Sequence, residues 1–188
     1  MAAAVFSAVS SISAAASGDF TVAALANSTT GGTGVVTFSL LAGQLFSVTV
    51  AADDLWNAGA LPRWSNANGL TQNLYWSPTI DNQVPNYNDF QLLIGEPYPL
   101  WTQENLTAPD GSLVGQIDNG NFFQIGTNYS GTASSSGTLK LYYFDSNYSD
   151  ITGSISAHVT AVPEPETFAM LLAGLGLVAG IARKRKPG

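Results

Sequence analysis

Oxygen-bearing side chains crowd one short stretch, FDSNYSDITG, at residues 144–153. Carboxylate, amide and carbonyl oxygens are the ligands that Ca²⁺ prefers, and two carboxylates in one tight loop repel each other unless a cation lies between them. Asp and Asn side chains can instead accept hydrogen bonds from nearby backbone amides and form a turn without metal. The stretch therefore predicts either a calcium loop, though not an EF-hand, or an Asx-rich turn. Its oxygen donors are Asp145, Asn147, Ser149, Asp150 and Thr152.

A second candidate for ligand binding is the aromatic-rich segment 53–99. A connection of this length without regular structure is usually functional or disordered, and its aromatic content argues against disorder. Tryptophan rings can stack on the flat faces of sugars, but they also serve as core residues and loop anchors. Both roles stay open for Trp56, Trp64 and Trp76.

Other chemistry has weaker support in the sequence. The chain has no cysteine, which excludes disulfides and thiol metal sites. His158 is the only histidine, and no serine or cysteine motif surrounds it, so we expect an ordinary strand residue. We predict that the protein is not an enzyme. The alternative is a polysaccharide hydrolase, whose carboxylate pair would come from Asp53, Asp54, Glu96 and Glu104, although nothing in the sequence fixes their separation.

Short strands must position these side chains. The stretch from Val35 to Val50 contains two β-rich runs broken at Ala42 and Gly43, and the second run alternates between polar and apolar residues. Similar runs separated by Gly, Asn, Asp and Ser lie at 113–117, 122–125, 137–144 and 153–160. The pattern predicts an all-β fold, a single antiparallel β-sandwich at 18–161, followed by a C-terminal hydrophobic helix.

Charge limits the partners of this domain. Between residues 18 and 161 there are two basic residues, Arg63 and Lys140, against eleven acidic ones, and the whole chain has a net charge of −7. Such a surface has no electrostatic footprint for nucleic acid. Residues 1–17 are small and apolar and end near Ala14, Ala15 and Ala16, which is typical of a signal peptide. No basic residue precedes them, so a remnant of a signal peptide and an Ala-rich first helix both stay open.

The C-terminal segment 162–188 predicts contact with a membrane. Its charge-free part, 167–182, would reach roughly 24 Å as a helix, and flanking basic side chains can close the gap to a hydrocarbon core of about 30 Å. A terminal basic cluster would stay in the cytoplasm and leave the preceding domain outside. That cluster consists of Arg183, Lys184, Arg185 and Lys186.

The order of these parts resembles the PEP-CTERM sorting signal of Gram-negative bacteria that make extracellular polysaccharide. Val162, Pro163, Glu164 and Pro165 match its tripeptide box and the valine that precedes it. The resemblance implies that exosortase, a membrane protease, cuts near the box after transient insertion in the inner membrane. The protein would then reach the cell surface or the biofilm matrix. An anchor that is never cut is the simpler alternative.

The stretch 112–159 looks like the second half of the bacterial calcium-dependent galactose-specific lectins, in which one Ca²⁺ coordinates two sugar hydroxyls. The likeness rests on SGTLKLYYFDSNYSDITGSISAHV and on VTVAADDLW at 48–56. It implies side-chain ligands at Asp145 and Asp150, whereas Ile151 stands where the family normally has Asn. It also implies candidate backbone ligands at Asn57, Asn147, Tyr148 and Ile151.

Together the two resemblances imply an exported noncatalytic protein that binds or organises extracellular polysaccharide. A structural matrix protein without a sugar site is the alternative.

Overall fold

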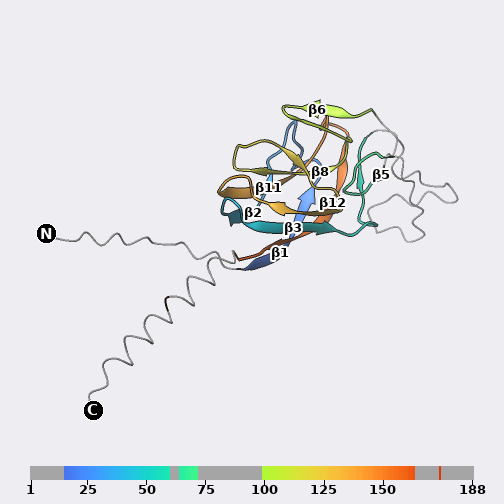
Figure 1. The fold of residues 1–188 in the computed structure, drawn as a ribbon. Coiled ribbons are helices and arrows are strands. Elements are labelled where there is room, and N and C mark those ends of the chain that lie inside the picture. The colour runs from blue at the N-terminus through green and yellow to red at the C-terminus, as the bar shows by residue number, and fades with distance from the viewer. Residues whose placement is uncertain (1–14, 60–63, 72–98, 164–173, 175–188) are drawn as a thin grey trace, which may run out of the picture.

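A computed structural model describes residues 15–59, 64–71, 99–163 and 174. These residues form two packed antiparallel sheets and a separate hairpin, which confirms the predicted sandwich (Figure 1). The strands in chain order are β1 (Ala16–Ala23), β2 (Val35–Leu40), β3 (Leu45–Val50), β4 (Trp56–Asn57), β5 (Trp64–Ser65), β6 (Trp101–Gln103), β7 (Leu106–Ala108), β8 (Leu113–Ile117), β9 (Phe123–Gln124), β10 (Asn128–Thr132), β11 (Gly137–Tyr143) and β12 (Thr152–Ala161).

Strand β12 is the centre of the larger sheet. The order of that sheet is β10-β3-β12-β4-β5, and β1 also pairs with β12 along its whole length, from Ala16 opposite Ala161 to Ala23 opposite Ser154. The second sheet has the order β2-β11-β8-β9, and β6 pairs only with β7. Every one of these strand pairs is antiparallel. The start of β1 and the end of β12 therefore lie side by side.

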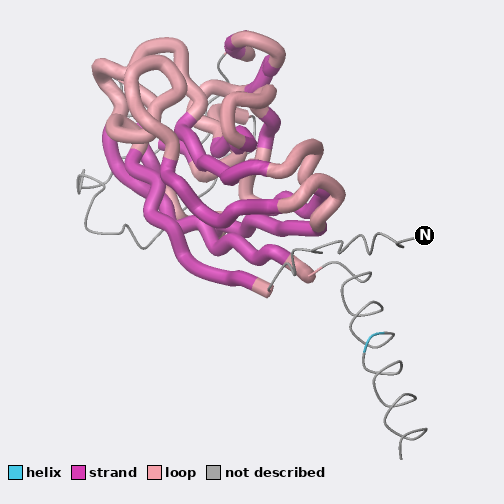
Figure 2. Tube along the Cα trace, turned by 90° about the vertical axis from the view of Figure 1, so that its left-hand side faces the viewer, coloured by secondary structure: helices cyan, strands magenta, loops and turns pink. Residues whose placement is uncertain are grey.

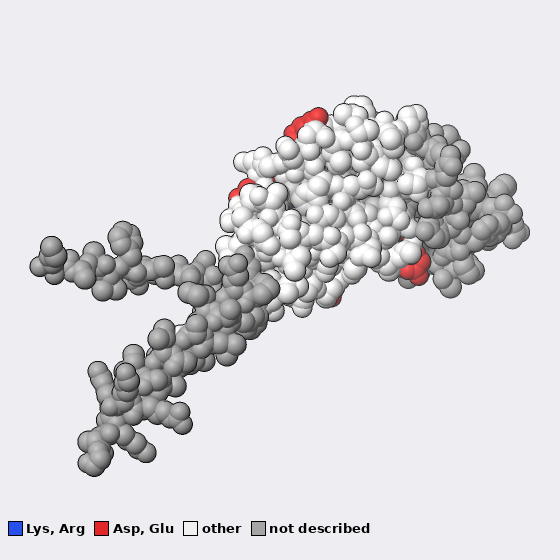
Figure 3. Space-filling view, viewed as in Figure 1, with Lys and Arg blue, Asp and Glu red and all other residues white. Residues whose placement is uncertain are grey.

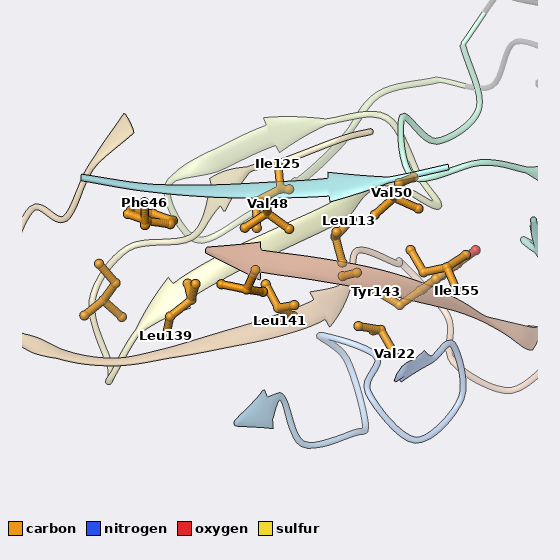
Figure 4. Close-up of a cluster of buried hydrophobic side chains, with 14 of the residues drawn as sticks. Val22, Phe46, Val48, Val50, Leu113, Ile125, Leu139, Leu141, Tyr143 and Ile155 are labelled. Atoms are coloured by element: carbon orange, nitrogen blue, oxygen red, sulfur yellow. The ribbon is translucent and has the colours of Figure 1, made fainter. Parts of the chain in front are cut away.

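Alternating apolar residues on the facing strands build the core. On β3 the side chains of Phe46, Val48 and Val50 point inward, as the sequence pattern predicts, and Gly43 makes the preceding turn with a φ of 84°. Figure 4 shows them interdigitating with apolar side chains from both sheets. Those partners include Val22, Leu113, Ile125, Leu139, Leu141, Tyr143 and Ile155.

Several strands were not expected from the sequence. The strand β1 begins at Ala16, two residues before the predicted start of the domain, and β10 is polar enough to escape the alternation rule. The segment 53–99 was predicted to lack regular structure, but it contains the two-residue strands β4 and β5. These strands are too short to give a periodic signal, and they form through pairing of β4 with β12 and of β5 with β4.

The strands are packed in layers, while the longer loops gather away from the paired ends of β1 and β12 (Figure 2). Lys140 is the only Lys or Arg among the described residues, and the face in Figure 3 carries only small, separate acidic patches. The described surface therefore has no basic patch that could bind a polyanion.

Candidate functional site

The candidate site lies where β12 begins. There β11 ends at Tyr143, the loop 144–151 follows, and Thr152 and Gly153 pair with Asn57 and Trp56 of β4. The turn 109–112 closes the site from a third side, because Gly111 N donates to Phe144 O at 2.8 Å and Phe144 N donates to Ser112 O at 2.9 Å. Three segments that are distant in the sequence thus meet around the oxygen-rich loop.

Trp56 fixes these segments to one another. Its side chain is fully buried, its Nε1 donates to Gly111 O at 2.7 Å, and its ring packs edge-on against Tyr143 with centroids 4.5 Å apart. Gly153 has a φ of 88°, and a Cβ at this position would lie 3.2 Å from the Cα of Trp56. Only glycine combines this left-handed backbone with so close an approach, so the pairing of β4 with β12 depends on it.

Asp145, the first acidic residue of the loop, is only 3% exposed and lies beside Asp110, which is 4% exposed. The two carboxyl groups are within hydrogen-bonding reach of each other. Asp110 Oδ2 accepts a hydrogen bond from Ser146 Oγ at 3.0 Å, but Asp110 Oδ1 and Asp145 Oδ2 have no partner. The hydroxyl of Tyr143, fully buried next to the pair, also lacks a partner. Buried oxygens normally find a donor, so this cluster has unused capacity to bind a ligand.

The electrostatics of the cluster follow from burial. Loss of hydration raises the pKa of Asp145 to about 7, and the negative charge of Asp110 adds to this effect. Burial likewise raises the pKa of Asp110. For Tyr143 burial raises the pKa well above its usual value, with further increases from Asp110, Asp145 and Asp150. Two carboxylates this close either share a proton or hold a cation between them.

Asp150 lies at the exposed rim of the same site. Its Oδ2 is 3.3 Å from the place where a Cβ of Gly59 would stand, so the structure brings Asp150 against the loop that follows β4. This is the loop that the sequence resemblance assigned a backbone ligand near Asn57. The negative charges of Asp150 and Asp145 both contribute to the raised pKa of Tyr143. Asp145 and Asp150 therefore border one site, with Asp145 inside and Asp150 outside.

The three other predicted backbone ligands, Asn147, Tyr148 and Ile151, lie in the loop 144–151 between β11 and β12. Asn147 is exposed, and its Oδ1 accepts hydrogen bonds from Ser149 N at 3.3 Å and Ser149 Oγ at 2.9 Å. This is an Asx turn of the kind that the sequence left open, and Asp145 takes part in it, because its carboxyl group accepts hydrogen bonds from the backbone amides of Ser146 and Asn147 while its Oδ2 has no partner. Tyr148 is half exposed, while the side chain of Ile151 is buried in the core and can offer the site only its backbone carbonyl.

Trp56 and Trp64 do not provide a stacking platform for sugars. Trp56 and Trp64 are 0% and 2% exposed, so neither presents a ring face to solvent. The carbohydrate-stacking role considered for these two residues is corrected accordingly, and their burial supports the alternative of core residue and loop anchor. Trp76 lies outside the described residues.

Asp110 was not identified from the sequence. It follows Pro109 and precedes Gly111, so it reads as an ordinary turn residue before a strand. The signal available was the turn itself, since β8 begins three residues later and pairs with β11, which leads directly into the acidic loop. In the described part of the chain no group of three His, Cys, Asp or Glu side chains converges as a metal site. A cation at Asp110 and Asp145 would therefore need further oxygens from carbonyls, hydroxyls or water.

Two of the remaining polar candidates, His158 and Asp54, have structural partners. His158 Nδ1 lies 2.7 Å from Asp19 Oδ1 across the β1–β12 pair, and both side chains are exposed. Asp54 Oδ2 accepts a hydrogen bond from Ser156 N at 2.6 Å. Glu104 has a φ of 52° in the turn between β6 and β7, and Glu96 lies outside the described residues.

The opposite end of β12 leads into the sorting segment. Val162 N donates to Leu45 O at 2.9 Å, and the buried Gln44 donates through Nε2 to Val162 O at 3.2 Å. Pro163 follows, whereas Glu164, Pro165, the basic cluster 183–186 and all of the predicted helix 167–182 except Gly174 lie outside the described residues. Within the described part, no helix is long and apolar enough to span a membrane.

Comparison with known proteins agrees with the position of this segment. Residues 161–186 match the family model described as the PEP-CTERM protein-sorting motif. Among solved structures the chain is similar to the N-terminal domain of EclA, a PllA-like lectin, with 18% identity and a TM-score of 0.44 over 77% of this chain and 95% of that chain. No curated protein matches the chain. The chain thus carries a PEP-CTERM sorting motif after its β-sandwich, and this motif implies processing by exosortase and export toward the cell surface.

Proposed function

We propose that this exported protein binds carbohydrate without catalysis, through one Ca²⁺ held by Asp145 in the loop between β11 and β12. The observation that supports the proposal most directly is the buried carboxylate of Asp145, whose Oδ2 has no partner although it lies under an exposed, oxygen-rich loop. An anionic oxygen kept out of water and out of hydrogen bonds is costly, and a cation would compensate for that cost.

The donor set favours calcium over other metals. Every candidate ligand is an oxygen, the chain has no cysteine, and its one histidine lies elsewhere on β12. Carboxylates mixed with carbonyls suit Ca²⁺, which accepts irregular shells of six to eight oxygens, better than Mg²⁺, which requires a small octahedral shell. Asp145 would hold the ion from the inside and Asp150 from the rim, with carbonyls of 57–59 and 147–151 as further ligands.

Sugar hydroxyls would complete the coordination of the ion from solvent. This part of the proposal rests on the sequence resemblance to calcium-dependent galactose-specific lectins and on the exposure of the rim, where Asn147, Tyr148 and Asp150 are accessible. Extracellular polysaccharide of the producing cell is the expected ligand class, because the sorting motif directs the protein to the surface where such polymers lie.

A calcium titration followed by a glycan array tests the proposal. For the full chain in detergent, Ca²⁺ at a hundredfold excess over Kd should add about 2.7 kcal/mol to the free energy of unfolding and raise the melting temperature by several degrees. Asp145→Asn should abolish most of this shift, whereas Asp19→Asn, an exposed carboxylate on β1, should leave it unchanged. Equal melting temperatures in EDTA and Ca²⁺ would refute the calcium site. Glycan binding that EDTA does not reduce would refute the role of calcium in sugar recognition.

Two alternatives are outcomes of the same experiments. A protein that binds Ca²⁺ but no glycan would be a structural matrix protein. The hydrolase alternative predicts new reducing ends when the protein is incubated with polysaccharide of its host. We expect none, because Asp54, one of the carboxylates assigned to that alternative, accepts a hydrogen bond from Ser156 N, and Glu104 lies apart from it in the turn between β6 and β7.

A further inference from the structure

We infer that Asp110 is a second carboxylate ligand of the cation, and that the Asp110–Asp145 pair, rather than the exposed loop, is the main determinant of its affinity. The inference rests on the proposed calcium site and adds to it a residue from a different part of the chain. Ser146, the neighbour of Asp145, and Asp110 are 36 positions apart, and the hydrogen bond between them joins the 109–112 turn to the acidic loop.

Burial is the first argument. Of the three carboxylates around the site, Asp110 and Asp145 are inside and Asp150 is at the exposed rim. An interaction between opposite charges is weakened by water, so a cation at the inner pair gains more from each carboxylate than a cation at the rim. The inner pair also gains more from a cation, because without one its two like charges face each other out of water.

Orphaned oxygens are the second argument, and they do not depend on charge. Asp110 Oδ1, Asp145 Oδ2 and Tyr143 Oη are all buried and without a hydrogen-bond partner, and they come from two distant segments, the turn 109–112 and the end of β11 with the loop that follows it. The tyrosine hydroxyl lies next to that turn: a Cβ on Gly111, the residue after Asp110, would stand 3.2 Å from it. A fully buried phenol beside two carboxyl groups, with one oxygen unused on each of the three side chains, indicates that the cluster lacks a partner.

Asp110 also accounts for a departure from the resembled family. Ile151 replaces the expected Asn, and its side chain is held in the apolar core, where it cannot be a ligand. A carboxylate from the 109–112 turn supplies an anionic oxygen from another direction, so the site keeps its number of side-chain ligands. Binding strength in oxygen sites follows the number of charged ligands.

Asp110→Asn is the decisive variant, because the amide keeps the shape of the side chain and can still accept the hydrogen bond of Ser146. We expect the affinity for Ca²⁺ to fall about tenfold or more. The melting temperature in EDTA should stay the same or rise, because one buried acidic group is removed. If Asp110 had only a structural role, Asp110→Asn would instead lower the melting temperature by the same amount in EDTA and in Ca²⁺. Asp19→Asn is the matched control, and Asp110→Ser is a second variant should the amide not fold.

Terbium luminescence gives an independent readout of where the ion lies. Tb³⁺ seeks the same oxygen ligands, and its emission is excited by transfer from nearby aromatic rings, here Tyr143 and the adjoining Trp56. The full chain in detergent should show strong sensitised emission that Ca²⁺ displaces, and Asp110→Asn should lose most of it. If Asp110→Asn binds Ca²⁺ and Tb³⁺ like the unaltered chain, the inference is wrong while the calcium site stands. If the unaltered chain itself shows no response to either ion, both are wrong.

Discussion

The two ends of β12 differ in how completely their polar groups are satisfied. At the Ala161 end, Gln44 is buried but fully used: its Oε1 accepts from Leu41 N at 2.9 Å and its Nε2 donates to Val162 O. At the Thr152 end, buried oxygens lack partners. Five of the six buried side-chain atoms without partners in the described residues lie in or next to the segments that form this end, while the sixth, Gln103 Oε1, is on β6: the five are Trp64 Nε1, Asp110 Oδ1, Ser112 Oγ, Tyr143 Oη and Asp145 Oδ2.

This contrast indicates different tasks for the two ends. Satisfied polar groups stabilise the place where the chain leaves the sheet, while unsatisfied ones mark a place prepared for a ligand. The ten residues of β12 separate these ends by roughly 30 Å, at about 3.3 Å per residue. The candidate site therefore lies at the end of β12 opposite to the one where the sorting motif begins, at residue 161.

The largest expected effect concerns the tail. Pro163→Ala combined with Glu164→Ala removes most of the tripeptide box, so exosortase should no longer process the chain, and full-length protein should accumulate in the inner membrane. Cell fractionation with an antibody to the sandwich measures this. Val36→Ala, an exposed substitution on β2, is the control and should be released normally. Normal release of the double variant would show that the box is not the processing signal.

The next largest effect concerns the scaffold of the site. Trp56→Ala should lower the free energy of unfolding by about 3–5 kcal/mol, because it leaves a cavity beside Tyr143 and removes the hydrogen bond to Gly111. Chemical denaturation of the variant checks this. Trp101→Ala, a partly exposed tryptophan on β6, should cost much less. Similar losses for both variants would contradict the anchoring role of Trp56.

A pH series tests the inner carboxylates directly. Since the pKa of Asp145 rises from 3.8 to about 7 on folding, the folded protein binds more protons than the unfolded chain between these values. In EDTA the free energy of unfolding should therefore fall as the pH rises from about 4 to 7, by on the order of a few kcal/mol, and level off above. Asp145→Asn should flatten this slope, and saturating Ca²⁺ should do the same by stabilising the charged form. A slope that is identical in wild type and Asp145→Asn would mean that another group titrates.

The smallest effect on stability is expected at the Ala161 end of β12, where Gln44 lies. Gln44→Met keeps the volume but leaves Leu41 N and Val162 O without their partner, which should cost about 1–2 kcal/mol. Gln116→Met is the matched control. Its half-buried side chain donates to Gly120 O at 2.9 Å and accepts from Tyr142 Oη at 3.2 Å, but Gly120 is exposed and water can replace the lost partner there, so the change should stay below about 1 kcal/mol. If Gln44→Met and Gln116→Met lowered the free energy of unfolding equally, the hydrogen bonds at the Ala161 end of β12 would be no more important than those of an ordinary surface turn.

Most strands could be predicted because alternation is a local property of the chain. Phe46, Val48 and Val50 point inward as their spacing requires, and the run 113–117 matches β8 residue for residue. The strand β10 could not be predicted in this way, because its residues are polar and their conformation depends on pairing with β3. The same reason applies to β4 and β5, which exist only as partners of β12 and of each other.

The candidate site divides along the same line. The sequence by itself determined that acidic and amide side chains share one loop between two strands, that cysteine chemistry is absent, and that a sorting motif follows the domain. Only the tertiary structure decided which carboxylate accompanies Asp145, which tryptophans are buried, and that Asp150 remains at the rim. Local composition records which ligand types are available. Their convergence depends on strand pairing that joins Asp110 and Ser146 across 36 positions, and no spacing rule along the chain contains that information.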